Sequence, residues 1–254
     1  RRPRDPRNPR VAIVGSGFGG IATAIKLKLA GFTEFTVFDK NPGPGGTWWE
    51  NSYPGAQVDV VSSYYSYSFM YDYDWPRTYA NQDEVQKYIE DVIDHFGIRS
   101  HFRFNTPVRE AVWDDRTNTY TVHTASGEAH ECEVVVSGVG MLNDPSIPDW
   151  PGLADFAGPK FHTARWEHQH ELAGKRVAVV GTGSTASQVV PAIAPKVKQL
   201  LLFQREPGFV LPKGDRELTR AEREKLRRWP FLQKLARIKN FVNIERFRAA
   251  ARPD

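Results

Sequence analysis

Cysteine is almost absent from this sequence of 254 residues, in which Cys132 stands alone. One cysteine can form neither a disulfide within the chain nor a zinc site built from several cysteines. Long apolar runs are also lacking, since no stretch reaches the roughly 18 apolar residues that a membrane span requires. The arginine-rich residues 1–10 contain no apolar segment of the kind found in secretory signals. These absences predict a cytoplasmic protein with no metal site and no membrane partner.

Positive charge is scarce in the middle of the chain and concentrated at its ends. Residues 1–10 carry a net charge of +4 and residues 213–254 a net charge of +7, which leaves −7 for residues 11–212. A nucleic-acid-binding protein would carry its positive charge on a recognition motif or among stacking aromatic side chains. We therefore favour a solvated helical face that steers anionic ligands, and we expect no nucleic-acid partner.

A glycine-rich turn follows the first apolar run of the chain. The run is RVAIV at residues 10–14, the turn is GSGFGG at residues 15–20, and apolar residues at helical spacing continue to Gly31. This order predicts the strand, turn and helix of a dinucleotide-binding unit. Gly15 permits the tight turn, Gly17 lets the backbone approach a pyrophosphate, and Gly20 lets the helix pack on the strand.

The residue after the second apolar run supports this interpretation over an accidental glycine turn. Residues 35–38 (FTVF) predict a second strand, and Asp39 follows it, 24 residues after Gly15. A carboxylate at this place accepts hydrogen bonds from a ribose diol. Asp39 therefore favours a cofactor with a free 2′-hydroxyl, such as FAD or NAD.

The same pattern returns in the second half of the chain. A strand is predicted at residues 176–180, a helix that ends near residue 194, and a strand at residues 199–204 that is followed by Arg205. The turn between the first strand and the helix consists of Gly181, Thr182, Gly183, Ser184, Thr185 and Ala186. Arg205 lies 24 residues after Gly181, where a guanidinium can bind a 2′-phosphate, or can simply end a strand in solvent. The contrast with Asp39 predicts FAD in the first site and NADPH in the second.

The remaining segments complete the predicted architecture. Apolar spacing predicts an amphipathic helix at residues 82–96, and residues 108–136 alternate as short strands, of which the last run, ECEVVVS, covers residues 131–137. We expect an α/β fold with two Rossmann-like dinucleotide-binding domains, both incomplete in this chain. The predicted divisions are a flexible basic lead-in at 1–10, an FAD-binding domain at 11–150, an NADPH-binding domain at 151–212 and a basic helical segment at 213–254.

Further motifs between and after the two turns resemble one enzyme family. They are GGTWW at 45–49, NSYPG at 51–55 and the series Phe156, Gly158, His162 and Trp166, which matches the fingerprint FxGxxxHxxxW. Together with both glycine turns, these motifs resemble class B flavin monooxygenases of the Baeyer–Villiger type over residues 10–212. Glu167 departs from the family, which usually has Pro or Asp there, and this weakens the assignment to the ketone-oxidising branch.

The resemblance implies roles for individual residues. Further cofactor contacts are implied for Lys40, Gly46, Thr47, Trp48, Tyr53, Asp59, Tyr65 and Val108. The aromatic members of this set could equally be core residues with a polar end. For His162 a conformational or hydrogen-bonding role between domains is favoured over that of a general base.

The resemblance also implies a reaction. NADPH would reduce the flavin, and the reduced flavin would react with O2 to give a peroxyflavin that converts a ketone into an ester or lactone. Asp59 matches the family aspartate that holds an arginine near the flavin, whose charge stabilises the peroxide anion. A structural aspartate that caps a turn is the alternative. In the family that arginine lies beyond the second nucleotide unit, so we expect it to be absent from this chain.

The end of the chain predicts a partner and leaves alternatives open. Residues 215–254 form a basic helical stretch broken at Pro230, whose apolar residues would be exposed if the chain ended there. We therefore expect an N-terminal fragment of a longer enzyme, or one chain of a split enzyme, with a C-terminal half as partner. The alternatives are a flavin monooxygenase that oxidises nitrogen or sulfur, and a nucleotide-binding fragment without oxygenase activity.

Overall fold

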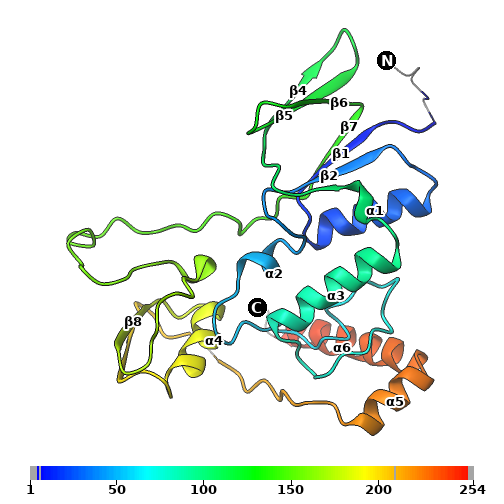
Figure 1. The fold of residues 1–254 in the computed structure, drawn as a ribbon. Helices are drawn as coiled ribbons and strands as arrows, with labels where there is room; N and C mark the ends of the chain where they lie inside the picture. Colours follow the sequence, from blue (N-terminus) through cyan, green and yellow to red (C-terminus); the bar gives the residue numbers. More distant parts are fainter. Residues whose placement is uncertain (1–4, 6, 209, 251–254) are drawn as a thin grey trace. The chain divides into compact units, whose positions relative to one another are not determined.

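The computed structural model describes residues 5, 7–208 and 210–250 (Figure 1). Contacts divide the chain into two compact units, which we treat separately. The first unit comprises residues 1–51 and 86–157, and the second comprises residues 52–85 and 158–254. Both contain parallel strands followed by helices, so the predicted α/β class is confirmed.

A parallel sheet forms the centre of the first unit. Its order is β3-β2-β1-β7, with β1 at Val11–Val14, β2 at Phe35–Phe38, β3 at Phe102–Arg103 and β7 at Val134–Ser137. Helix α1 (Phe18–Leu29) follows β1 and buries Ile21, Ala24 and Ile25 completely, as its apolar spacing predicts. Because α1 starts directly after the glycine turn, its N-terminus lies at the carboxyl end of β1.

An antiparallel meander adjoins this sheet in sequence. It consists of β4 (Val108–Asp114), β5 (Thr119–Thr124) and β6 (Ala129–Cys132). We expected residues 131–137 to form one strand, but the chain leaves the meander at Glu133 and joins the parallel sheet as β7. The amides of Glu133 and Val134 both donate to the carbonyl of Arg10, whose guanidinium donates to the Glu133 carboxylate at 2.6 Å. This ion-paired junction marks the change of sheet.

Helix α3 (Gln82–His95) is the amphipathic helix expected at residues 82–96. It buries Tyr88, Ile89, Val92 and Ile93 completely, and the boundary between the two units falls inside it. Two short helices were not foreseen from the sequence, namely α2 (Thr47–Glu50) and the 3-10 turn η1 (Arg99–His101). Both contain too few residues for a periodic apolar pattern to show.

The second unit contains the other strand, turn and helix. Strand β8 (Arg176–Val180) pairs in parallel with β9 (Gln199–Phe203), and α4 (Ser184–Ile193) lies between them in sequence. In the described part of the chain this sheet has two strands. Leu201, Leu202 and Phe203 on β9 are each more than 40% exposed.

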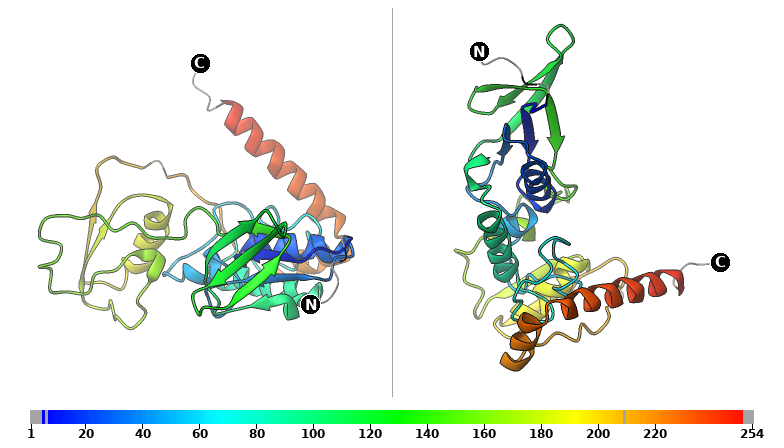
Figure 2. Two further views of the ribbon diagram at one scale, coloured as in Figure 1. Left: turned by 90° about the horizontal axis from the view of Figure 1, so that it is seen from above. Right: turned by 90° about the vertical axis from the view of Figure 1, so that its right-hand side faces the viewer.

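Two helices end the described chain, and the break between them confirms the effect expected of Pro230. They are α5 (Arg220–Arg228) and α6 (Phe231–Ala250), and α6 is the long orange-to-red helix in both views of Figure 2. Its apolar side chains Leu235, Ile238 and Phe241 are about half exposed, at 54%, 52% and 51%. None of the helices in the described ranges is long and apolar enough to cross a membrane.

Residues 52–85 pack with the second unit, although they precede the strand β7 that completes the sheet of the first. The guanidinium of Arg237 on α6 donates to the carbonyls of Ser63, Tyr64 and Ser66 at 3.3, 3.0 and 2.8 Å. The sequence-based division between the domains at residues 150 and 151 remains a prediction. The contacts add that the segment at residues 52–85 is hydrogen-bonded to α6, one of the helices that follow β9.

Candidate functional site

The two glycine turns have the same backbone geometry. The amide of Gly15 donates to the carbonyl of Phe38, and the amide of Gly181 donates to that of Phe203, both at 2.8 Å. Gly15 has φ +100° and Gly181 has φ +107°, a region that favours glycine. The repeat seen in the sequence is therefore a repeat in three dimensions, and each turn presents a helix N-terminus (α1 or α4) to a ligand.

The first turn is packed too closely for side chains at two of its glycines. A Cβ at Gly15 would collide with the carbonyl of Gly138, and one at Gly20 would collide with the carbonyl of Gly15. A Cβ at Gly46 would lie 3.0 Å from the Cα of Gly17, so the loop before α2 lies against the turn. This backbone-lined cradle fits a dinucleotide pyrophosphate, which needs close approach to main-chain amides.

Asp39 is buried and bonded to the turn. One carboxylate oxygen accepts from the amide and the hydroxyl of Ser16, at 2.7 and 2.6 Å, and the other accepts from the amide of Asn41 at 2.8 Å. The carboxylate therefore fixes the turn as well as standing at the end of β2. Both lone-pair sites of Oδ2 are thus used by Ser16, and Oδ1 keeps one further lone pair for a ribose hydroxyl.

The other predicted residues of the first unit lie on three segments. Thr47 starts α2, in which Trp48 is buried, and Lys40 pairs with Glu50 at 3.0 Å. Val108 starts β4 and packs against a buried cluster that contains Ala12, Phe38, Val122 and Cys132. Gly46 thus lies against the first turn and Thr47 and Trp48 follow it in α2, whereas Val108 contacts the buried cluster.

The second turn is more open than the first. A Cβ at Gly181 or Gly183 would meet nothing within 4 Å, and Ala186 occupies the place that Gly20 has in the first turn. The hydroxyl of Thr182 donates to the carbonyl of Glu206 at 3.2 Å, which ties the turn to the segment after β9. Ser184 and Thr185 begin α4.

The strand registers correct the equivalence that we expected between Asp39 and Arg205. Val14 is paired with Phe38 in the first unit and Val180 with Phe203 in the second. The structural counterpart of Asp39 is therefore Gln204, and Arg205 corresponds to Lys40. Counting 24 residues failed because the segment between turn and strand end is one residue shorter in the second unit. Gln204 brings no negative charge, so the second site still lacks the carboxylate that would repel a 2′-phosphate.

Asp59 and Tyr53 lie on a loop that contacts α4. The Asp59 carboxylate accepts from Nε2 of Gln188 at 2.8 Å, and the Tyr53 hydroxyl donates to Oε1 of the same residue at 2.9 Å. Burial raises the pKa of the Tyr53 hydroxyl. Sequence reasoning missed Gln188, because nothing local in a helix indicates a partner about 130 positions away.

Lys213, also missed, supplies a cation to the same carboxylate. Its ammonium lies 3.5 Å from Oδ1 of Asp59 and 5.2 Å from the centre of the Tyr79 ring. Burial lowers the pKa of Lys213, and the charge of Asp59 opposes this shift. In the described part of the chain, the ion pair of Asp59 is therefore with a lysine.

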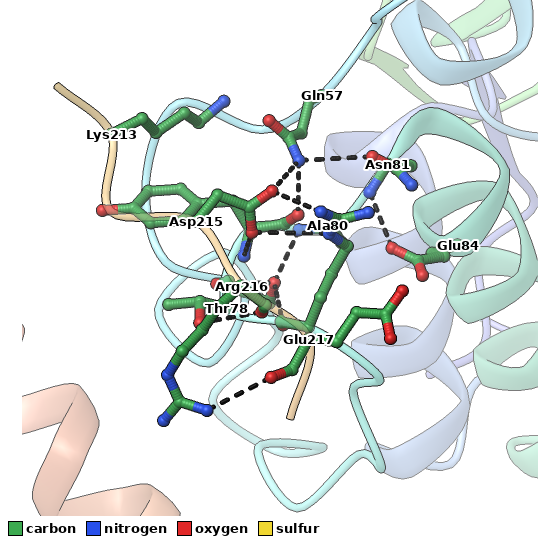
Figure 3. A network of polar contacts seen from close by, with 12 residues as sticks. Gln57, Thr78, Ala80, Asn81, Glu84, Lys213, Asp215, Arg216 and Glu217 are labelled. Atoms are coloured by element: carbon green, nitrogen blue, oxygen red, sulfur yellow. Dashed lines mark hydrogen bonds and ion pairs between the residues drawn. The ribbon is translucent and has the colours of Figure 1, made fainter. Parts of the chain in front are cut away.

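A network around Asp215 fixes the backbone that carries Lys213 (Figure 3). The Asp215 carboxylate accepts from the guanidinium of Arg77 at 2.5 Å, from the side-chain Nε2 of Gln57 at 2.8 Å and from the backbone amide of Tyr79 at 3.3 Å. Burial opposes ionisation, but these hydrogen bonds together hold the pKa of Asp215 below its usual range. The amide of Thr78 donates to the carbonyl of Arg216, so the two segments run together.

Comparison with known proteins decides the family. Residues 8–217 match the family described as flavin-binding monooxygenase-like. The chain belongs to this family. A Baeyer–Villiger monooxygenase of Streptomyces coelicolor is 47% identical over 228 residues, which are 90% of this chain and 44% of that protein.

Solved structures of flavin-binding monooxygenases agree in fold. Cyclohexanone monooxygenase from Rhodococcus sp. Phi1, bound to NADP+, has a TM-score of 0.81 and 41% identity, over 88% of this chain and 43% of that one. OTEMO in complex with FAD and NADP has a TM-score of 0.80 and 30% identity, over 87% and 44%. The chain thus spans less than half the length of these family members.

The fingerprint of this monooxygenase family lies where the two units join in sequence. Phe156 belongs to the first unit, and Gly158, His162 and Trp166 belong to the second. Nδ1 of His162 accepts from the amide of Ala164 at 3.1 Å and caps the 3-10 turn η2 (Thr163–Arg165). This bond is local to the turn, and the role between domains expected of His162 stays a prediction.

Two other positions singled out in the sequence have local partners. The carboxylate of Glu167, the departure from the family pattern, lies 2.9 Å from Nε2 of His170 and accepts from Gln169 at 3.1 Å. Tyr65 lies in the turn whose carbonyls bind Arg237 on α6. The structure thus places Tyr53, Asp59, Tyr65, the second glycine turn and Arg205 in the second unit.

Proposed function

We propose that this chain supplies the FAD- and NADPH-binding parts of a monooxygenase that inserts one oxygen atom of O2 beside a ketone carbonyl, giving an ester or lactone. The observation that carries the proposal is the pair of glycine turns, which share one backbone geometry but differ in the residues after the second strand. These are Asp39 after β2, and Gln204 and Arg205 after β9. The 47% identity to a Baeyer–Villiger monooxygenase supports it. The substrates are O2 and a small organic ketone, and the activity is that of the natural protein that contains this chain.

FAD is assigned to the first turn. The amides at the N-terminus of α1 face its pyrophosphate, Gly17 lets the backbone approach it, and Asp39 accepts from its ribose, while Gly15 and Gly20 allow the turn to form. When bound, the flavin supplies hydride acceptance and the activation of O2. We assign Gly46, Thr47 and Trp48 to the same cofactor, because their loop lies against the turn. Lys40 and Val108 remain proposed contacts from the family resemblance.

NADPH is assigned to the second turn. Gly181 and Gly183 admit the pyrophosphate, the first residues of α4 donate to it, and Arg205 binds the 2′-phosphate. Thr182, Ser184 and Thr185 line the same turn. Gln204, the neighbour of Arg205, is uncharged and therefore leaves the phosphate unopposed.

Asp59 is assigned a charge-positioning role. Its carboxylate accepts a hydrogen bond from Gln188 and pairs with Lys213, and in the proposed enzyme it orients a cation close to the reacting groups. In the proposed reaction a positive charge stabilises an oxygen anion, and a carboxylate behind the cation holds it in place. No arginine of the described chain contacts Asp59, and we assign the catalytic arginine to none of them.

Oxidation of nitrogen or sulfur is the second candidate function. Glu167 favours it, because this residue departs from the ketone-oxidising pattern and is engaged with His170. Such a reaction needs no cation to hold an oxygen anion. Asp59 and Lys213 would then serve only to fix the local structure.

Product analysis separates the candidates. The natural protein is purified, its flavin content is measured, and it is incubated with O2, NADPH and either a cyclic ketone or an aryl alkyl sulfide. Lactone from the ketone supports the proposal, whereas sulfoxide alone supports heteroatom oxidation. A protein that binds neither flavin nor NADPH would overturn both.

A further inference from the structure

Gln188 makes four hydrogen bonds with one loop, residues 53–59. Its Oε1 accepts from the Tyr53 hydroxyl at 2.9 Å and from the Gln57 amide at 3.2 Å. Its Nε2 donates to the Gln57 carbonyl at 2.9 Å and to Asp59 Oδ1 at 2.8 Å. A side-chain amide has two donor hydrogens and two acceptor lone pairs, so its whole capacity is spent on this loop.

Packing around Gln188 allows the loop little movement. Gly55 has φ +84°, and a Cβ there would lie 2.5 Å from the Gln188 carbonyl and 2.9 Å from the Ala192 side chain. The loop backbone therefore rests directly on α4, the helix that begins at the second glycine turn. The N-terminus of α4 is also proposed to bind the nucleotide. One helix therefore carries both the second glycine turn and Gln188, which is hydrogen-bonded to Asp59.

The opposite side of Asp59 is held by charge. Lys213 faces its carboxylate at 3.5 Å, and Asp215 anchors the segment of Lys213 to Arg77 and Gln57. Gln57 connects the two groups, since its main chain is hydrogen-bonded to Gln188 and its side chain donates to Asp215. The side chain of Asp59 is nevertheless 61% exposed, so solvent on its remaining face leaves it free to bind another group.

We propose that Gln188 is a positioning residue that sets the orientation of the Asp59 carboxylate and the Tyr53 hydroxyl relative to the nucleotide-binding helix α4. The proposal rests on the proposed function, in which Asp59 orients a cation next to the reacting groups. Because the side-chain amide of Gln188 is fully used by this loop, we assign it no bond to substrate or cofactor. Its loss therefore affects how much of the consumed NADPH yields oxygenated product more than it affects NADPH binding.

Three variants of the natural protein test this role. Gln188→Leu keeps the approximate volume and removes all four bonds. Gln188→Glu keeps an acceptor for the Tyr53 hydroxyl and the Gln57 backbone amide, but a carboxylate oxygen replaces the group that donates to Asp59 and to the Gln57 carbonyl. Ser187→Ala is the matched control, because Ser187 is the exposed neighbour on α4 and, among the described residues, its hydroxyl donates to the Gly183 carbonyl alone.

Hydrogen exchange measures the contact without any turnover. We expect the peptide that contains the Gln57 amide to exchange roughly tenfold faster in Gln188→Leu, because its acceptor is lost. Ser187→Ala should exchange like the wild type. A Gln188→Leu variant with wild-type protection at residues 53–59 would overturn the proposal. If that variant fails to fold, the isosteric Gln188→Glu supplies the test through its pH profile.

The pH profile separates positioning from general support. In Gln188→Glu the new carboxylate faces Asp59, Tyr53 and, across Asp59, the ammonium of Lys213. At high pH the two carboxylates repel, and as the pH falls they share a proton that restores a donor. We expect product per NADPH to fall roughly tenfold in Gln188→Leu at every pH, with little change in the KM for NADPH. In Gln188→Glu the loss should shrink as the pH falls from about 8 to about 6.

The outcomes distinguish this inference from the proposed function. A Gln188→Glu variant whose ratio to wild type stays constant with pH would refute the positioning role. If the wild type forms no product from ketones, the proposed function fails, and the same pH comparison is made on the rate of flavin reduction by NADPH. Gln188→Leu with a KM for NADPH raised as much as kcat is lowered would show that Gln188 only supports the nucleotide site.

Discussion

Single residues decide whether each nucleotide turn can form. Gly15 combines a positive φ with contact to the Gly138 carbonyl, so it meets two separate obstacles to a side chain. Gly19, four residues on, has neither, since a Cβ there would meet nothing within 4 Å. The two positions therefore form a matched pair within one motif.

We expect Gly15→Val to give protein without bound flavin, because the added side chain displaces the turn from the Gly138 carbonyl. Gly19→Ala should keep the yellow colour, since alanine is accommodated in the first turn of α1 and is favourable in helices. The measurement is the ratio of flavin absorbance to protein absorbance after purification. Full flavin content in Gly15→Val would place the cofactor elsewhere.

Arg205 and Gln204 define the preference of the second site. Arg205→Ala should weaken NADPH use by about 1.5–3 kcal/mol, the range for a hydrogen bond to a charged group, with a much smaller effect on NADH. Gln204→Asp should shift preference further toward NADH, because it restores the carboxylate found at the equivalent Asp39. Steady-state kinetics with both cofactors measures this. The control is Arg176→Ala, which lies at the start of β8, whereas the glycine turn follows the end of that strand. Equal losses with NADPH and NADH would contradict the assignment.

At the scale of elements, helix α5 shows how local sequence fixes a boundary. Thr219 and Glu222 form a capping box, in which the Thr219 hydroxyl accepts from the Glu222 amide and the Glu222 carboxylate accepts from the Thr219 amide. Hydrogen bonds from the Arg216 side chain, and then from Thr219, lower the pKa of Glu222 from 4.5 to about 2. A carboxylate with a depressed pKa stabilises the fold in its ionised form.

The contribution of Glu222 should therefore be complete above pH 4.5 and disappear as the pH falls through about 2. We expect Glu222→Gln to melt at a lower temperature than wild type near neutral pH, with a difference that shrinks over this acidic range. Thermal unfolding followed by circular dichroism measures it. Glu224→Gln, which removes only an exposed pair with Arg220, should show a smaller pH dependence. A difference that grows on acidification would contradict the capping role.

Elements with a repeating apolar pattern could be predicted from the sequence, and elements defined by distant partners could not. The strands at 35–38 and 176–180 agree with β2 and β8, because short apolar runs between polar residues or glycines are local signals. The division of residues 131–137 at Glu133 depends on Arg10, and the register of Gln204 depends on pairing with β8. The Gln188 contacts depend on a loop far back in the chain. Each of these needs the fold before it can be seen.

At the scale of the whole molecule, the two units differ in how many strands their parallel sheets contain. The first has four parallel strands in the described chain and the second has two, with Leu202 and Phe203 of β9 exposed. Exposed apolar faces of strands are typically covered by other segments of the protein or by a partner. The length of the relatives, more than twice the matched region, is consistent with additional segments in those proteins.

We expect the 254-residue chain, expressed by itself with FAD and NADPH, to release hydrogen peroxide and to form no ester. Oxygen transfer requires exclusion of water and a cation at the reacting oxygen, and in the described chain Asp59 pairs with Lys213 alone. Gas chromatography for products and a peroxide assay measure the split. Substantial ester formation by this chain would show that its own residues suffice.

The sole cysteine gives an experimental handle on the arrangement of the two units. Cys132 is a free thiol with 4% of its surface exposed, and burial raises its pKa, so it reacts slowly with maleimides. A cysteine introduced at an exposed position of each unit would carry a spin label or fluorophore with little background. Distances between such labels, measured with and without NADP+, would report whether the separation of the units changes when the nicotinamide cofactor binds.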